Sequence, residues 1–155
     1  MATLKAATVA ILNGDTDLTD VFTGGFVNVG DLPKRQLDYS TIQREADGVT
    51  IKPTGALRWR GPQSMRGPDH AAMYMLDLYL YDDDSGDRDK IDYGKRRIWE
   101  LLQKKYLGST DHEGFAYFWW LNDLGDLPQG QDQEDTLTAN MDLMRFQITI
   151  TRKQS

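Results

Sequence analysis

The sequence contains no cysteine among its 155 residues. This absence excludes disulfide bonds, thiol nucleophiles, and zinc or iron–sulfur sites with cysteine ligands. It indicates a protein made and used in a reducing cytosol, or in a particle assembled there. Only two histidines are present, His70 and His112, and neither has a second ligand at helical i, i+4 spacing. We therefore expect no metal and no cofactor.

Long apolar runs are also missing. The first fifteen residues hold one lysine and a short apolar stretch, which ends in Asn13, Gly14 and Asp15 without a small-residue cleavage site. This pattern does not predict a signal peptide, and no segment approaches the length of a membrane span. We expect assembly in the cytoplasm and no membrane partner.

Basic residues are too few to balance the acids. The chain has 18 Lys and Arg against 24 Asp and Glu, a formal net charge of −6. A protein that holds a phosphate backbone by bulk attraction needs the opposite balance. The acidic charge does not exclude nucleic acid near the protein. A surface that lets DNA pass without binding it is expected to be neutral or acidic.

The apolar content is sufficient for a core. Hydrophobic residues make up 39% of the chain and aromatic residues 10%. A chain of this size forms one domain and buries about 68–70% of its unfolded surface. We predict a single domain over residues 1–155.

Hydrophobic periodicity predicts a short N-terminal helical region and a sheet. Apolar residues recur at helical spacing after Thr3, a predicted N-cap, and alternate at a period of two further along the chain. The segment 32–53 is predicted to be mostly irregular, and 122–140 to be a long acidic loop. The predicted elements are helices at 3–12, 16–22, 39–46 and 87–107, and strands at 26–29, 56–60, 72–81, 115–121 and 141–151.

The longest predicted helix has a core stripe and charged ends. Lys104 and Lys105 fall in its predicted last turn, and Gly108 is at the predicted C′ position. Its expected buried residues are Ile91, Ile98, Leu102 and Tyr106. Together the elements predict an α+β fold, in which a mostly antiparallel sheet carries an N-terminal helix and one long helix on one face.

The spacing of the candidate catalytic and metal-binding residues does not match known motifs. A calcium loop that starts at Asp82 would need glycine at its sixth position and glutamate at its twelfth, where the chain has Asp87 and Tyr93. No nucleophile elbow or phosphate-binding loop occurs. We expect no catalytic residues, and an enzyme that uses the 111–113 segment (Asp111, His112 and Glu113) is the alternative.

The aromatic segment 115–121 has two interpretations. Aromatic side chains stack on bases, but this segment has no interleaved Lys or Arg, which a single-strand binder needs. A core strand or a subunit-interface strand is favoured, because both of its faces are apolar, and Trp119 and Trp120 are the predicted interface residues. Arg58 and Arg60 project together from their strand, and could pair with acids of a neighbouring subunit or contact phosphate.

The order of elements resembles the tail-terminator and head–tail joining proteins of long-tailed bacteriophages. The resemblance lies in the N-terminal helix that leads into Gly24-Gly25, and in the strand–loop pair ALRWRG…MYMLDLYLYDDD. It continues through the helix IDYGKRRIWELLQKKYLG and the closing strand LMRFQITITRK. It spans most of the chain, and is strongest from Ala56 to the end.

This resemblance implies a ring, usually of six subunits, at the head-proximal end of a tail tube. The ring would end tube polymerisation and contact the tail tube and the head or neck connector, while DNA passes through without specific binding. We predict that the 122–140 loop contacts a partner or faces the channel through Asp123, Asp126, Asp132, Glu134 and Asp135. The alternative is a non-catalytic adaptor or small-ligand-binding module that uses 115–121.

Overall fold

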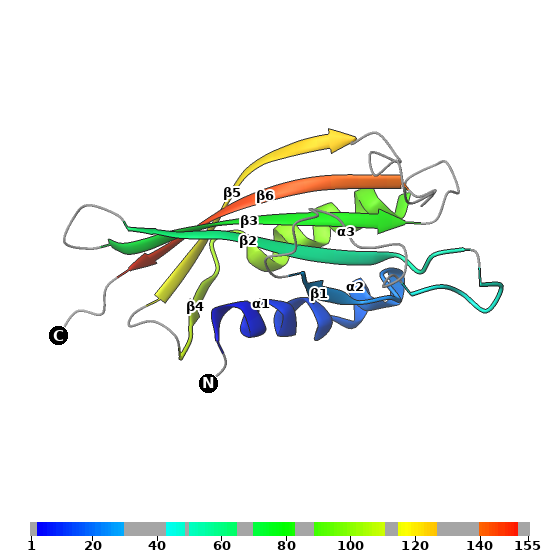
Figure 1. The fold of residues 1–155 in the computed structure, drawn as a ribbon, viewed down its shortest axis with the longest axis horizontal. Helices are drawn as coiled ribbons and strands as arrows, with labels where there is room; N and C mark the ends of the chain where they lie inside the picture. The colour runs from blue at the N-terminus through cyan, green and yellow to red at the C-terminus, as the bar shows by residue number, and fades with distance from the viewer. Residues whose placement is uncertain are drawn as a thin grey trace.

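The computed structural model describes residues 3–29, 43–48, 50–64, 70–82, 89–110, 115–126 and 140–151. The helices and strands of these segments form one sheet with helices against it (Figure 1). In chain order they are α1 (Leu4–Asn13), α2 (Thr16–Val21), β1 (Phe26–Asn28), β2 (Thr54–Ser64), β3 (His70–Asp82), α3 (Asp89–Leu102), β4 (Tyr106–Gly108), β5 (Phe115–Asp126) and β6 (Asn140–Thr151).

The sheet has six strands in the order β1-β2-β3-β6-β5-β4. Only β1 and β2 run parallel, and all other neighbours are antiparallel. The most apolar strand, β3, is one of the two central strands, as expected for a strand with largely apolar residues on both faces. The α+β fold with a mostly antiparallel sheet is therefore confirmed.

The two N-terminal helices begin at side-chain caps. The Thr3 hydroxyl accepts a hydrogen bond from the Ala6 N–H (3.3 Å), as predicted for α1. The Asp15 carboxylate accepts one from the Asp17 N–H (3.1 Å) at the start of α2. These bonds satisfy amide groups that lack a partner within the helix, so both helices begin at defined residues.

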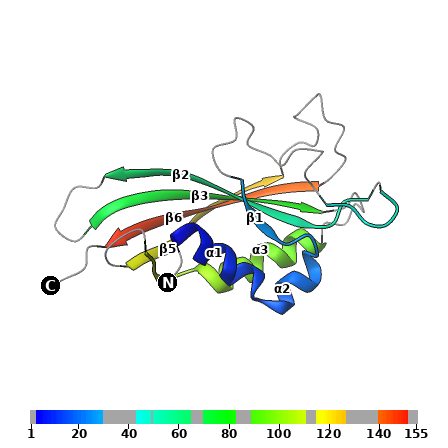
Figure 2. The same ribbon diagram turned by 60° about the horizontal axis from the view of Figure 1, so that its bottom comes forward.

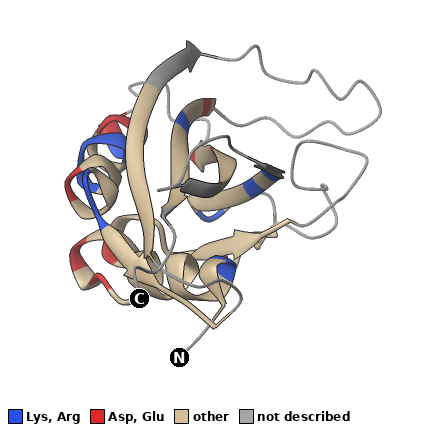
Figure 3. Cartoon of the chain, turned by 90° about the vertical axis from the view of Figure 1, so that its left-hand side faces the viewer, with Lys and Arg blue, Asp and Glu red and all other residues tan. Residues whose placement is uncertain are grey.

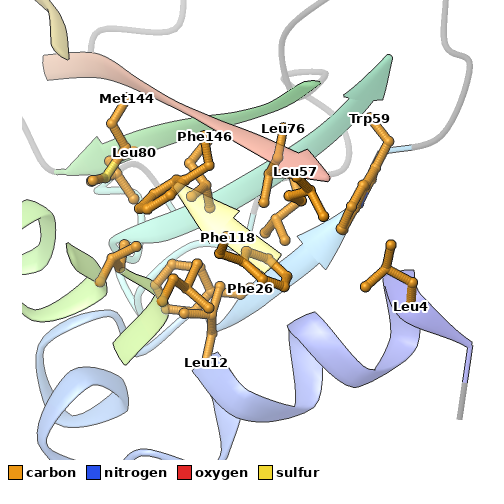
Figure 4. Close-up of a cluster of buried hydrophobic side chains, with 14 of the residues drawn as sticks. Leu4, Leu12, Phe26, Leu57, Trp59, Leu76, Leu80, Phe118, Met144 and Phe146 are labelled. Carbon is orange, nitrogen blue, oxygen red and sulfur yellow. The ribbon is translucent and has the colours of Figure 1, made fainter. Parts of the chain in front are cut away.

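All three helices lie on the same side of the sheet (Figure 2). Their apolar stripes and the facing strand residues form the main core (Figure 4). Leu12 of α1, Ile98 of α3, and Leu76 and Phe146 of the central strands are fully buried there. Each such side chain contributes about 1.5–3 kcal/mol of burial free energy. Because these three helices all lie on one side of the sheet, they leave its other side uncovered.

Helices α2 and α3 pack at very short range. A Cβ added to Gly94 of α3 would lie 2.3 Å from the ring of Phe22, so only glycine fits. Beside this contact, the Arg97 Nε donates to the Asp15 carboxylate at 2.6 Å. This hydrogen bond, opposed by desolvation, holds the pKa of Asp15 below its ordinary value. The same contact raises the pKa of Arg97.

Helix α3 ends earlier than the sequence predicts. Lys104 adopts a left-handed backbone conformation (φ 62°) directly after the helix. Its N–H donates to the Phe118 carbonyl (2.9 Å), and the Lys105 carbonyl accepts from the Phe118 N–H (3.0 Å). Sheet hydrogen bonds therefore replace helical ones. The predicted core position of Tyr106 and the predicted C′ role of Gly108 are wrong, since both residues belong to β4.

Two strands are longer than predicted. Strand β5 continues through Asp126, with register shifts against β6 after Trp120 and after Asp123. Residues 122–126 are thus strand and not loop, because a bulged strand can keep pairing through polar residues and glycine. Strand β2 likewise runs through Pro62 to Ser64, again with a register shift. Asn140, the last residue of the predicted acidic loop, begins β6, and residues 127–139 lie outside the described residues.

The segment before β2 contains no helix at residues 43–46. Instead, Arg44 forms an isolated antiparallel bridge with Ile51 around a turn at Asp47-Gly48. The other residues of the predicted 39–46 helix lie outside the described residues. Ile51 packs with Tyr79, Tyr81 and other residues in a second, smaller core. This segment therefore helps to cover one end of the sheet face that the helices leave bare.

Candidate subunit-interface surface

The sheet side away from the helices is only partly covered. Cross-strand register places one set of side chains there, beyond the small core at Tyr79 and Tyr81. We call this set the open face. Its members are Arg58, Arg60, Met73, Met75, Asp77, Lys104, Tyr106, Phe115, Tyr117, Trp119, Arg145, Gln147 and Thr149.

A buried carboxylate forms the centre of the open face. Asp77 of β3, with 3% of its side chain exposed, lies between Arg58 of β2 and Arg145 of β6 in the strand register. The Arg145 Nε donates to Asp77 Oδ1 at 2.7 Å, and the Arg60 Nε lies 3.3 Å from Oδ2. Two guanidinium groups thus satisfy one carboxylate, an arrangement that stabilises and orients all three side chains.

Arg58 differs from the other two arginines. It is directly opposite Asp77 in the register, yet the described residues show no ion pair for it. Arg60 and Arg145 are 41% and 24% exposed at the side chain despite their contact with Asp77.

Aromatic rings form a row on the same face of the sheet as the arginines. Tyr106 of β4 contacts Tyr117 of β5 with ring centroids 4.7 Å apart, and Tyr117 contacts Trp119 at 6.2 Å. The Lys104 Nζ lies 5.9 Å from the centroid of the Trp119 ring. Tyr106 is 62% exposed and Trp119 45% exposed. Large rings with this much exposure are typical of a surface that another molecule covers.

The composition of the open face matches that of a protein interface. Trp, Tyr, Met and Arg are the residue types enriched at the centres of such interfaces, and Trp, Tyr and Arg dominate binding energy. The open face contains all four types, with one lysine. The sheet also supplies what the aromatic segment lacks in sequence, because arginines from β2 and β6 lie on the same face as Tyr117 and Trp119.

Three of the four predicted interface residues lie on this surface. Arg58, Arg60 and Trp119 share the open face, as strand alternation predicts. Trp120 is on the opposite side, where its ring packs against the main core. Its N–H donates to the Gln103 Oε1 at 2.6 Å.

The predicted acidic loop residues are only partly described. The backbone of Asp123 and Asp126 belongs to strand β5. Asp132, Glu134 and Asp135 lie outside the described residues, as do Asp111, His112 and Glu113 of the enzyme alternative. The loop hypothesis therefore remains a prediction.

Sequence reasoning missed several members of the open face. Asp77 and Arg145 each interrupt an apolar strand, and opposite charges at facing positions of two strands would have been a signal. Tyr106 was missed because it was assigned to the helix.

Two further properties concern the described part of the chain. No group of three or more His, Asp or Glu side chains there is placed to hold a metal ion. No helix in the same residues is long and apolar enough to span a membrane.

The fold is similar to that of a virion protein. A chain of a solved structure described as the virion of a native gene transfer agent (GTA) particle superposes with a TM-score of 0.60. The match covers 96% of this chain and 95% of that chain at 12% sequence identity. At this identity the likeness shows a shared fold. No family model matches the sequence, and no curated protein matches it.

Proposed function

We propose that this protein is a structural component of a phage-like virion. It forms a ring at the head-proximal end of the tail tube, ends tube polymerisation, and joins the tail to the head or neck. Its partners are other copies of itself, the tail tube protein and a connector protein. The observation that carries this proposal is the likeness, over nearly the full length of both chains, to a chain of a GTA virion particle.

The surface of the subunit supports an assembling role. The open face exposes Tyr106 and Trp119 and carries Arg58 on the same side of the sheet, a combination suited to tight contact with protein. In a closed ring each subunit repeats the same contact, so a moderate pairwise free energy gives a stable assembly. The net charge of −6 suits a ring through which DNA moves without being held.

Imaging of the purified protein tests ring formation. Negative-stain electron microscopy and mass photometry of the purified wild-type chain are expected to show one closed ring species. A monomer that a small ligand stabilises against heat would instead support the adaptor alternative.

The structure of particles assembled without this protein tests where the ring lies in the virion. Particles assembled without this protein are expected to have tail tubes of uncontrolled length that lack heads, because nothing ends polymerisation or joins the two parts. A gold-labelled copy should mark the head–tail junction. Tails of normal length that are joined to heads in the absence of the protein would contradict the proposal.

A further inference from the structure

We propose that the open face binds the helical side of a second copy of this chain, so that subunits associate head to tail. This inference rests on the proposed ring and names the contact that builds it. On the helical side, the surface concerned is an exposed set that we call the helical stripe. Its members are Asp17, Asp20, Asp92, Arg96, Trp99 and Glu100.

The open face is cationic on an acidic molecule. Its described side chains include three arginines and Lys104 against Asp77 alone, a formal charge of +3. Since the whole chain carries −6, the remaining residues carry −9. The chain is therefore its own source of complementary charge, and complementary potentials favour association while like charges oppose it.

The helical stripe offers both acids and a large ring. Asp92, Arg96, Trp99 and Glu100 recur at i, i+3 and i+4 spacing and form the outer side of α3. Trp99 is 45% exposed. Glu100 is partly engaged, since Arg97 donates to it at 3.0 Å.

Acids of α2 extend the stripe. The Tyr93 hydroxyl donates to the Asp17 carbonyl at 3.5 Å, which places α2 against the first half of α3. Figure 3 shows acidic positions, with basic positions among them, along the helices. With Asp17 and Asp20 included, the stripe has four acids and one base, so it complements the open face in charge. Trp99 likewise complements the aromatic row.

The two surfaces lie on opposite sides of the sheet (Figure 2). A contact between different surfaces of identical subunits repeats from copy to copy and closes into a ring when the rotation allows. A contact between two open faces would bring +3 against +3 and would stop at a dimer. Charge and geometry therefore both favour the head-to-tail arrangement that a ring requires.

Two matched tryptophan substitutions test this contact. Trp119→Ser removes the ring from the open face, and Trp99→Ser removes the equally exposed ring from the helical stripe. Each variant alone is expected to require at least tenfold more protein to assemble than the wild-type chain. An equimolar mixture is expected to form a heterodimer without rings, because only one intact open face meets one intact stripe. Analytical ultracentrifugation and mass photometry measure both outcomes.

Control variants make the result specific. Ala10→Ser, a change at an exposed position of α1 outside both surfaces, should assemble like the wild-type chain. If Trp119→Ser loses its circular dichroism spectrum, Tyr106→Ser replaces it, since that ring is 62% exposed.

The possible failures are distinguishable. A wild-type ring that survives both tryptophan substitutions, or that loses assembly only with Trp119→Ser, overturns this contact and leaves the proposed function intact. A wild-type chain that stays monomeric overturns both. Binding of a single-stranded oligonucleotide that is lost in Trp119→Ser, with assembly unchanged, assigns the open face to nucleic acid and overturns the contact.

Discussion

At the scale of residues, Asp77 shows how a charge can be buried in an apolar strand. Removing its carboxylate from water is costly, and two guanidinium groups offset that cost with charge-assisted hydrogen bonds. Neither arginine is fully buried, so both retain contact with solvent. The cluster therefore stabilises the register of β2, β3 and β6 while it keeps positive charge on the surface.

The two arginines should differ in their effect on stability. Arg145→Ala removes the shorter contact (2.7 Å) from the less exposed arginine, and is expected to lower the free energy of unfolding by about 1.5–3 kcal/mol. Arg60→Ala removes the longer contact (3.3 Å) from a more exposed side chain, with an expected loss below about 1 kcal/mol. Urea unfolding of the two variants tests the order, and a larger loss for Arg60→Ala would contradict it.

The Asp15–Arg97 pair should make stability depend on pH in the acid range. Because the folded-state pKa of Asp15 is lowered, the folded state binds this proton less readily than the unfolded state. The stabilisation is present above the ordinary value of 3.8 and is lost as pH falls through the folded-state pKa. Asp15→Asn should therefore lower stability at pH 6 and reduce its further loss toward pH 2.

Urea unfolding at several pH values measures this dependence. Asp20→Asn is the control, because Asp20 is exposed and the described residues show no ion pair for it. If the Asp15→Asn variant and the wild-type chain lost stability equally on acidification, the pair would have no such role.

At the scale of elements, the packing of α3 on α2 depends on the absence of a side chain at Gly94. Gly94→Ala would place a methyl group against the fully buried ring of Phe22, and the backbone of two packed helices must shift to admit it. Overpacking of this kind costs about 1–3 kcal/mol, which exceeds the gain of up to about 1 kcal/mol from higher helix propensity. We therefore expect a net loss of stability.

Thermal unfolding checks the effect of Gly94→Ala. The matched control is Arg96→Ala, an exposed change in the same helix that removes only a contact with the Tyr93 ring, and its loss is expected to stay below about 1 kcal/mol. A Gly94→Ala chain that is more stable than the wild type would show that α2 can move aside at no cost.

The outer edge of β5 is partly covered by neighbouring segments of the chain. Strand β4 is only three residues long, and beyond it Gln103 binds the Trp120 N–H with its side chain. Unpaired strand edges invite pairing with other chains, so this cover restricts β-sheet extension at that place. It leaves the open face as the larger surface for contact.

At the scale of the whole molecule, the uneven distribution of charge predicts salt-sensitive assembly. Screening shortens the range of charge interactions from about 10 Å at 0.1 M salt to about 3 Å at 1 M. We expect the assembled fraction to fall over this range, with a smaller dependence in Arg58→Gln because that variant has one fewer complementary charge. Sedimentation at several salt concentrations measures the slope.

A control variant again separates local from general charge effects. Lys5→Gln removes a positive charge from an exposed position of α1, outside both surfaces. This variant should keep the wild-type dependence of assembly on salt. Equal slopes for Arg58→Gln and Lys5→Gln would show that Arg58 makes no contact with a charged partner.

The sequence by itself determined the elements whose periodicity is strong. Alternation correctly predicted the shared face of Arg58 and Arg60, because side chains of a strand point to alternate sides whatever lies nearby. Helical spacing likewise predicted the buried stripe Ile91, Ile98 and Leu102 in α3. Local geometry fixes these features.

Only the tertiary structure decided where elements end and which side chains meet. Tyr106 is in a strand and not in the helix, because Lys104 and Lys105 form backbone hydrogen bonds with Phe118 of β5, which is distant in sequence. The order and register of the strands brought Asp77 into contact with Arg145, and placed the arginines on the same sheet face as the aromatic row. Such contacts arise between distant segments, and hydrophobic periodicity within one segment carries no information about them.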